Sequence, residues 1–220
     1  MAAEFCDRVR IEYVRVPMRD GVEICAKVTR PDDAGCFPAI MEYNPYRRLR
    51  QPLPNYRDEY PPAVPYLVER GYVAVQFDAR GTGNSSGWNT DIYNLEEQQD
   101  ACEMVRWIAA QPWCSGQVGM IGKSFSAVVQ WQVAVQAPSA LKAIIVRSAN
   151  DDVYTEWVYP GGCLRPYMFD SYSGNMNAWN FAPPDPDVVG DRWYEIWQER
   201  LQQSAPWGIG YLSHPLQGPY

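Results

Sequence analysis

The feature that most constrains the fold is a short apolar strand that leads through a serine directly into a helix. Residues 118–121 have the apolar continuity of a buried strand, and Ser124 follows two positions after Gly122. The stretch 125–136 is apolar almost all round, which predicts a helix packed inside a larger body. A strand that turns at once into a helix is typical of an α/β fold.

Strand-like and helix-like segments alternate over the first 150 residues. Two runs flank the turn 19–21 and predict a β-hairpin, 9–16 and 22–28. Three further apolar runs suit buried strands, 38–43, 72–77 and 141–146, and the run 72–77 is apolar enough for burial on both faces. This alternation predicts a mostly parallel sheet.

Two helices between these strands carry recognisable end signals. Gly71 closes a short helix over 66–70. Asn94 can cap a longer helix that ends before Pro112, and Glu97 stands where a capping box requires it. The expected apolar face of this helix consists of Leu95, Cys102, Val105 and Ile108.

The pattern changes near residue 150. Residues 150–220 are rich in tryptophan and tyrosine and show no strand with the apolar continuity of the earlier ones. One helix is predicted there, over 191–202, with Trp193, Trp197 and Leu201 on one face. We therefore divide the chain into an α/β part, 1–150, and an aromatic-rich insertion, 151–220.

Composition and charge exclude several classes of protein. The net charge of −7 argues against nucleic-acid binding, because phosphate contacts need a basic surface. No apolar run approaches the ~20 residues of a membrane span, and the first residues lack the features of a secretory signal, so we expect a cytoplasmic protein. The six cysteines show no zinc-type spacing, and free buried thiols are expected at Cys25 and Cys102. We expect neither a metal nor a cofactor.

The strand–serine–helix unit suggests a nucleophile elbow, in which a tight turn presents a serine hydroxyl above a sheet. Ser124 would be the nucleophile, and the backbone N–H of Phe125 would be the usual donor to the oxyanion of acyl transfer. Gly122 allows close backbone packing, whereas Ser126 stands where the common motif has glycine. The alternative is a serine that merely caps a helix after a strand.

A base for this serine is harder to find. The single histidine, His214, lies in the segment 212–215, and no strand-like run precedes it, so we expect a packing or solvent-facing role. The glycine-rich loop 78–87 follows a strand as a dinucleotide site would. Ser86 occupies the position of its third glycine, however, and the next helix begins too late to face a pyrophosphate. We interpret the loop as a structural turn beside the site.

Several short segments of the chain form a characteristic set: 18–22, 44–47, 78–83, 111–114, 118–124, 141–144, 151–154, 161–163, 184–186 and 190–193. Taken together, these segments resemble the cocaine-esterase-like (CocE/NonD) hydrolases, relatives of the X-prolyl dipeptidyl peptidases and α-amino-acid ester hydrolases. The resemblance runs through essentially the whole chain.

The resemblance implies the N-terminal portion of an α/β-hydrolase core, with a mostly parallel sheet, followed by the start of a helical cap. It implies that Ser124 is the nucleophile and that Tyr46 joins the Phe125 N–H in the oxyanion hole. Family members continue well past the cap, and their catalytic acid and histidine lie in that continuation. The resemblance therefore implies an N-terminal fragment that lacks these two groups.

Two hypotheses follow from different classes of function. The first is a serine hydrolase of small-molecule esters or peptide-like amides, active when the acid and base are supplied. The second is a catalytically silent product whose sheet edge and apolar surface bind a partner.

Overall fold

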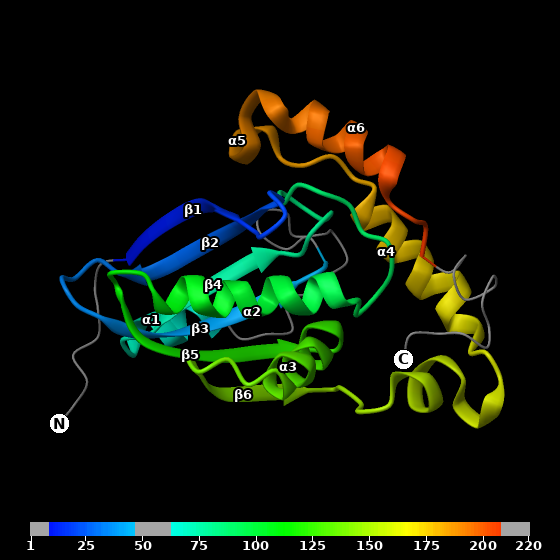
Figure 1. The fold of residues 1–220 in the computed structure, drawn as a ribbon, viewed down its shortest axis with the longest axis horizontal. Helices are drawn as coiled ribbons and strands as arrows, with labels where there is room; N and C mark the ends of the chain where they lie inside the picture. The colour runs from blue at the N-terminus through cyan, green and yellow to red at the C-terminus, as the bar shows by residue number, and fades with distance from the viewer. Residues whose placement is uncertain (1–8, 47–62, 208–220) are drawn as a thin grey trace.

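The hairpin predicted at the start of the chain forms one edge of a six-stranded mixed sheet (Figure 1). The computed structural model describes residues 9–46 and 63–207. Strand β1 (Val9–Pro17) pairs with β2 (Glu23–Pro31) in antiparallel register, and β2 pairs in the same way with β4 (Val73–Asp78). The turn between the first two strands lies at 18–22, where the Met18 N–H donates to the Val22 carbonyl at 2.8 Å.

The rest of the sheet is parallel. Strand β3 (Phe37–Asn44) lies between β4 and β5 (Cys114–Lys123), and β6 (Leu141–Arg147) lies outside β5. The complete order is β1-β2-β4-β3-β5-β6. The predicted α/β fold with a mostly parallel sheet is confirmed, and the carboxyl ends of β3, β4, β5 and β6 share one edge, where ligands of open α/β sheets bind.

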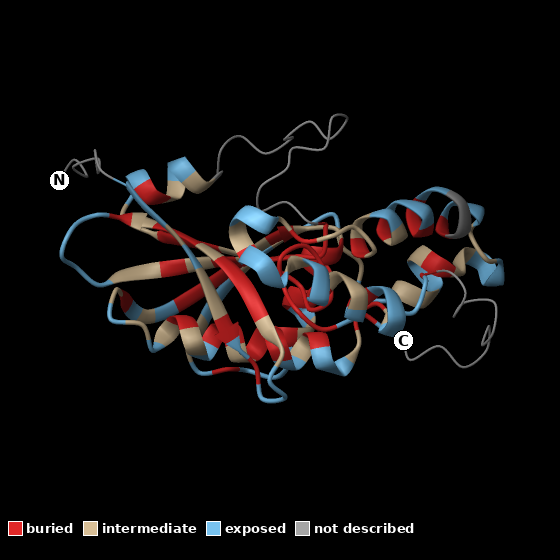
Figure 2. Ribbon diagram, turned by 90° about the horizontal axis from the view of Figure 1, so that it is seen from above, coloured by how far each residue is buried: buried red, intermediate tan, exposed pale blue. Residues whose placement is uncertain are grey.

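Three helices connect these strands. Helix α1 (Ala63–Glu69) packs on β2 and β4, whereas α2 (Leu95–Ala109) and α3 (Phe125–Val135) pack on β5 and on each other. Figure 2 shows the buried residues concentrated between the sheet and these helices. Fully buried side chains at the centre include Met41, Phe77, Met104, Ile108, Met120 and Phe125.

Helix α2 confirms its predicted cap and corrects its predicted face. Asn94 Oδ1 accepts from the Glu97 N–H at 2.9 Å. In a capping box the Glu97 side chain would accept from the Asn94 N–H. It accepts instead from the N–H of Tyr93, one residue earlier. Leu95 is 67% exposed, so its assignment to the apolar face was wrong: it begins the helix at the solvent side, and the buried face starts at Glu97.

Two apolar segments are more exposed than their sequences predict. The run 141–146 was expected to be a buried strand, but β6 is an edge strand of the described sheet and Ile145 is 53% exposed. Helix α3 likewise turns Phe125 and Val129 inward but exposes Trp131 and Val135. An apolar run records a preference for burial; whether it is buried depends on what packs beside it.

The segment from 153 to 207 is helical over much of its length, and we call it the helical segment. The sequence predicted one helix there, 191–202, which matches α6 (Trp193–Gln203). Of its expected face, Trp193 and Trp197 are half-buried but Leu201 is exposed; Ile196 and Arg200 are the buried positions. The other turns were missed, because they are too short for a helical period to show in the sequence. They are η1 (Val153–Val158), η2 (Pro160–Gly162), η3 (Met168–Tyr172), α4 (Ser173–Asn180), α5 (Pro186–Val189) and η4 (Gly190–Arg192).

The described cysteines are all free, and Cys25 and Cys102 are buried thiols as predicted. Across the two described ranges, no helix combines the length and apolarity that crossing a bilayer requires.

Candidate active site

Ser124 occupies a strained turn between β5 and α3. Its backbone has φ +58° and ψ −123°, outside the regions that L-residues ordinarily adopt. Such a conformation costs roughly 1–3 kcal/mol and persists only when its surroundings fix it. Here the Ser124 N–H donates to the Arg147 carbonyl at 3.0 Å, and the Ser124 carbonyl accepts from the Ala127 N–H at 2.8 Å. The side chain makes no capping hydrogen bond to α3, which argues against the alternative of a simple helix cap.

The residues around the turn explain how the chain reaches this conformation. A Cβ on Gly122 would lie 2.6 Å from the backbone oxygen of Ser126, so only glycine fits there without a shift. Ser126, which replaces the glycine of the common motif, is buried and donates its hydroxyl to the carbonyl of Tyr43. The substitution therefore anchors the start of α3 to β3 and leaves the elbow intact.

Tyr46 lies directly after β3 and reaches the same turn. Asn44 Oδ1 accepts from the Tyr46 N–H at 2.9 Å and bends the chain at the strand end. The hydroxyl oxygen of Tyr46 accepts from the Phe125 N–H at 3.1 Å. The two oxyanion-hole groups expected from the sequence thus lie together at the residue after Ser124. The Tyr46 ring is buried edge-on against Trp179, with ring centroids 5.4 Å apart.

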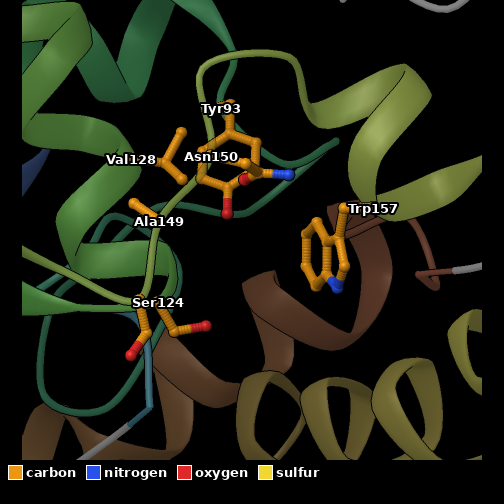
Figure 3. Close-up of a pocket in the computed structure, with 7 residues that line it drawn as sticks. Tyr93, Ser124, Val128, Ala149, Asn150 and Trp157 are labelled. Carbon is orange, nitrogen blue, oxygen red and sulfur yellow. The ribbon is translucent and has the colours of Figure 1, made fainter.

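A cavity of about 190 Å³ opens beside Ser124 (Figure 3). Its walls come from the loop before α2, from α3, from the segment that follows β6, and from η1. The lining residues are Tyr93, Ser124, Val128, Ser148, Ala149, Asn150 and Trp157. The cavity is smaller than the 300–1,000 Å³ typical of drug-sized ligands, so it suits a small group.

Sequence reasoning missed every cavity residue except Ser124. Ser148, Ala149 and Asn150 follow the carboxyl end of β6, and that position was a usable signal, because ligands of open parallel sheets bind at this edge. Tyr93 carried no comparable signal, since its positive φ of +55° cannot be read from the sequence.

The helical segment covers the site with aromatic side chains. Trp207 packs against Phe125 with ring centroids 5.7 Å apart, and Trp157 packs edge-on against Tyr172 at 4.8 Å. The tryptophans of this segment therefore divide between packing, as Trp207 does, and lining the cavity, as Trp157 does.

The glycine-rich loop 78–87 is folded on itself, in agreement with its interpretation as a structural turn. Asp78 Oδ2 accepts from the Asn84 N–H at 2.8 Å. A Cβ on Gly83 would lie 2.2 Å from the same carboxylate, so this packing of the loop requires glycine at position 83. In the ranges 9–46 and 63–207, no three potential ligand side chains are grouped to hold a metal ion. His214 lies outside the described residues.

Comparison with known proteins identifies the family. The family model of the X-Pro dipeptidyl-peptidases (S15 family) matches residues 20–208. The cocaine esterase of Rhodococcus sp. (strain MB1 Bresler) is 36% identical over 157 residues, a match that covers 69% of this chain and 26% of the esterase. The chain spans about a quarter of the length of this esterase and of a putative serine esterase of Mycobacterium bovis (strain ATCC BAA-935 / AF2122/97).

Solved structures agree with this result. A CocE/NonD family hydrolase from Staphylococcus aureus superposes with a TM-score of 0.71 at 26% identity, covering 86% of this chain and 38% of that protein. An α-amino acid ester hydrolase superposes with a TM-score of 0.61 at 25% identity, covering 80% and 31%. The chain therefore belongs to the X-Pro dipeptidyl-peptidase (S15) family of hydrolases and has its α/β-hydrolase fold.

Proposed function

We propose that this member of the X-Pro dipeptidyl-peptidase (S15) family is a serine hydrolase of esters or peptide-like amides, with Ser124 as its nucleophile. One observation carries the proposal. The strained Ser124 stands beside two groups that can donate to an oxyanion, the Phe125 N–H and the Tyr46 hydroxyl, which are 3.1 Å apart.

The chemistry proceeds by acyl transfer. Ser124 Oγ attacks the substrate carbonyl carbon and loses its proton to a base, and the carbonyl oxygen becomes an oxyanion. That oxygen accepts from the Phe125 N–H, which in the structure donates to Tyr46 Oη. It also accepts from the Tyr46 O–H. The leaving alcohol or amine departs with a proton from the protonated base, and water then releases the acid from the acyl-serine by the same route in reverse.

The substrate class follows from relatives and from the cavity. One relative is named for hydrolysis of an ester, and the family is named for dipeptidyl-peptidase activity. The cavity of about 190 Å³ has room for a small acyl group and is walled by Tyr93, Val128 and Trp157. We therefore propose a small-molecule ester or short peptide-like substrate.

We further propose that the acid and the base lie beyond these 220 residues, as the family resemblance implies. The only histidine of the chain is His214, for which the sequence predicts no catalytic position. Residues 1–150 would then supply the nucleophile and the oxyanion donors, and residues 151–220 would begin the cap.

A binding role without catalysis is the second candidate, and β6 favours it. This edge strand exposes Ile145, and the neighbouring α3 exposes Trp131 and Val135. An open edge beside apolar side chains is a surface on which another polypeptide can pair.

Covalent labelling separates the two candidates. The 220-residue chain is incubated with a fluorophosphonate, and the modified peptide is identified by mass spectrometry, with Ser148→Ala as a matched control from the same cavity. We expect label on Ser124 in the parent and in Ser148→Ala, and none in Ser124→Ala. Labelling will be slow, because loss of triad members can cost about 10⁴ to 10⁶ in rate.

The outcomes are distinct. Aryl-ester turnover that Ser124→Ala abolishes would show that the chain is active as it stands. Label on Ser148 in place of Ser124 would contradict the assigned nucleophile. No label at either serine, even after prolonged incubation, would contradict a reactive Ser124 in this chain and favour the binding role.

A further inference from the structure

Tyr93 forms a wall of the Ser124 cavity from an unusual backbone position. It lies just before the cap of α2 and has φ +55°, which is uncommon for a large side chain. Its ring is buried against Phe125, with centroids 4.2 Å apart, and lies 6.4 Å from the ring of Trp157. Figure 3 shows the ring in the cavity, with Ser124 and Trp157 nearby.

Side chains hold the backbone of Tyr93 at both polar atoms. Its N–H donates to Glu97 Oε2 at 2.9 Å. Its carbonyl accepts from Gln98 Nε2 at 3.0 Å and from Gln132 Nε2, which lies on α3, at 3.4 Å. A residue in a strained conformation keeps it only when its surroundings determine it in this way.

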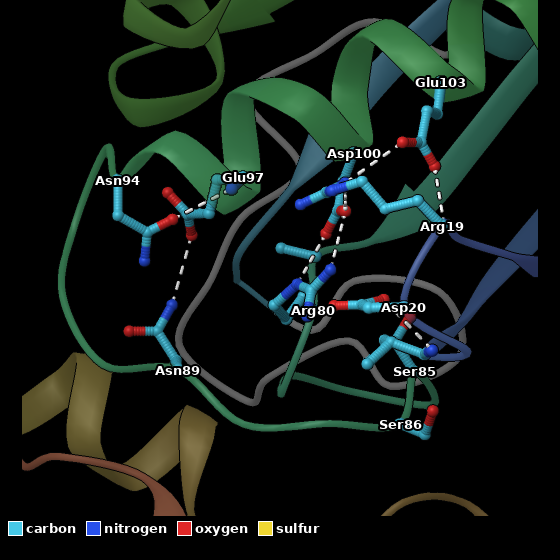
Figure 4. A network of polar contacts seen from close by, with 12 residues as sticks. Arg19, Asp20, Arg80, Ser85, Ser86, Asn89, Asn94, Glu97, Asp100 and Glu103 are labelled. Carbon is cyan, nitrogen blue, oxygen red and sulfur yellow. Dashed lines mark hydrogen bonds and ion pairs between the residues drawn. The ribbon is translucent and has the colours of Figure 1, made fainter.

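Glu97 is the buried member of this arrangement. It is 1% exposed, and its second oxygen accepts from Asn89 Nδ2 at 3.1 Å (Figure 4). The Asn89 carbonyl in turn accepts from the Ala205 N–H at 2.9 Å. The Glu97 carboxyl therefore links α2, the cavity wall and the end of the helical segment. Helix capping alone does not require these bonds, because Asn94 already satisfies the Glu97 N–H.

We propose that Tyr93 determines the size of the acyl group that fits beside Ser124, and that Glu97 is the positioning residue that fixes Tyr93 there. This inference rests on the proposed function, since it assigns the cavity to the acyl group. Removal of the ring opens the cavity to larger groups. Removal of the Glu97 carboxyl leaves two buried donors, the Tyr93 N–H and Asn89 Nδ2, without their acceptor. The backbone of Tyr93 then relaxes from its strained conformation.

The test compares two substitutions at Glu97. Glu97→Leu removes the acceptor at similar size. Glu97→Gln keeps an acceptor for the Tyr93 N–H, and a turn of the Asn89 amide restores the second bond. Burial raises the pKa of Glu97 to about 8, which favours the protonated carboxyl at pH 7 and makes glutamine a close substitute. Tyr93→Leu and Tyr93→Phe report on the ring itself, and Asn94→Ala removes only the helix cap.

The readout is the ratio of affinities for two ketones without a leaving group, butanone and acetophenone. Binding is followed in the 220-residue chain by the NMR shift of the Trp157 indole N–H, identified with Trp157→Phe. We expect Tyr93→Leu and Glu97→Leu to shift the ratio toward acetophenone by about tenfold, the scale on which a pocket discriminates by size. Tyr93→Phe, Glu97→Gln and Asn94→Ala should keep the parent ratio.

Four results would overturn the inference: an unchanged ratio in Tyr93→Leu, an unchanged ratio in Glu97→Leu, an equal shift in Glu97→Gln, or an equal shift in Asn94→Ala. Thermal unfolding of each variant identifies loss of fold, and Glu97→Leu still tests the position of the cavity wall if Tyr93→Leu does not fold. Ketone binding does not depend on the reactivity of Ser124. Failure of fluorophosphonate labelling would therefore contradict the proposed function. The assignment of Tyr93 and Glu97 to the cavity wall would still be tested by the ratio of ketone affinities.

Discussion

At the scale of single residues, the site depends on a contact between two groups that lie far apart in the sequence. The hydroxyl of Tyr46 and the amide of Phe125 are separated by 79 positions and meet because β3 and β5 are neighbours. Tyr46 follows one strand and Ser124 follows the other, so the parallel sheet aligns their ends.

Tyr46→Phe removes one proposed oxyanion donor and keeps the ring. We expect kcat for an aryl ester to fall about 100-fold in a preparation that turns over, with little change in KM, because the donor acts mainly in the transition state. Tyr13→Phe, at an exposed tyrosine of β1, is the matched control and should leave kcat unchanged. A rise in KM of similar size with kcat unchanged would place Tyr46 in substrate binding instead.

Gly122→Ala tests the packing of the elbow. The added Cβ would meet the Ser126 backbone at 2.6 Å, and we expect a loss of about 1–3 kcal/mol in the free energy of unfolding, the usual cost of overpacking. Gly174→Ala is the control, because no atom lies within 4 Å of its Cβ in α4 and alanine favours helix. Urea unfolding followed by tryptophan fluorescence measures both, and equal midpoints would contradict the steric argument.

At the scale of secondary-structure elements, an ion-pair network ties α2 to the loops around it (Figure 4). Asp100, 1% exposed on α2, accepts from Arg80 Nε at 2.7 Å and from Arg80 Nη2 at 2.8 Å. It also accepts from Arg19 Nη1 at 2.8 Å. Burial by itself would lower the pKa of Arg80, but the bonds to Asp100 and Asp20 outweigh it and keep the guanidinium charged. The network thus joins α2 to the β1–β2 turn and to the loop after β4.

Asp100→Ala should be strongly destabilising. It leaves the buried Arg80 without its main partner, and breaking a buried pair costs about 3–5 kcal/mol. Glu103→Ala removes a neighbouring carboxylate that is partly exposed and also binds Arg19, and it should cost less than about 1 kcal/mol. The difference in denaturation midpoint between the two variants is the measurement, and similar midpoints would show that the network adds little.

At the scale of the whole molecule, Arg200 joins the helical segment to the loop that follows β4. It is fully buried on α6 and donates to the carbonyls of Ala182, at 2.7 Å, and of Gly83 and Ser85, at 3.1 and 2.9 Å. Asp185 adds a second link, because its N–H donates to Asn84 Oδ1 at 2.8 Å. The loop that resembled a dinucleotide site is therefore the surface on which the helical segment docks.

Arg200→Leu should loosen that docking. Buried carbonyls lose their donors, so we expect faster cleavage by trypsin or chymotrypsin within 150–207 while the sheet stays protected. Arg192→Leu removes an exposed arginine that pairs with Glu23 at 2.8 Å, and it should leave the cleavage rate near that of the parent. Cleavage distributed evenly over the chain would indicate global unfolding and contradict local docking.

The stability of the whole molecule should also depend on pH through Glu97. Burial raises its pKa from 4.5 to about 8, and Asp100 acts in the same direction, while Tyr43 lies close enough for its own pKa to be raised by burial and by Glu97. The native state therefore binds this proton more tightly than the unfolded state. The contribution of Glu97 protonation to the free energy of unfolding is complete below about pH 4.5 and is lost as pH rises through about 8. Glu97→Gln should flatten this part of the curve of unfolding free energy against pH, and an unchanged slope would contradict the assignment.

The sequence by itself determined the α/β alternation, the hairpin, the caps at Asn94 and Gly71, and the turn at Ser124. These features are local: periodicity, glycine and capping side chains act within a few residues, so their signals lie in adjacent positions. The family resemblance added Tyr46, which no local pattern could connect to Ser124.

Only the tertiary structure decided which apolar segments are covered and what surrounds the serine. Leu95, Ile145 and Trp131 look like core residues but are exposed, because burial depends on the neighbours that packing supplies. Tyr93 and Glu97 look like ordinary loop and helix residues, yet they meet at the cavity wall. Their positions follow from a positive φ and from hydrogen bonds between separate elements, and those are set by the three-dimensional arrangement of the chain.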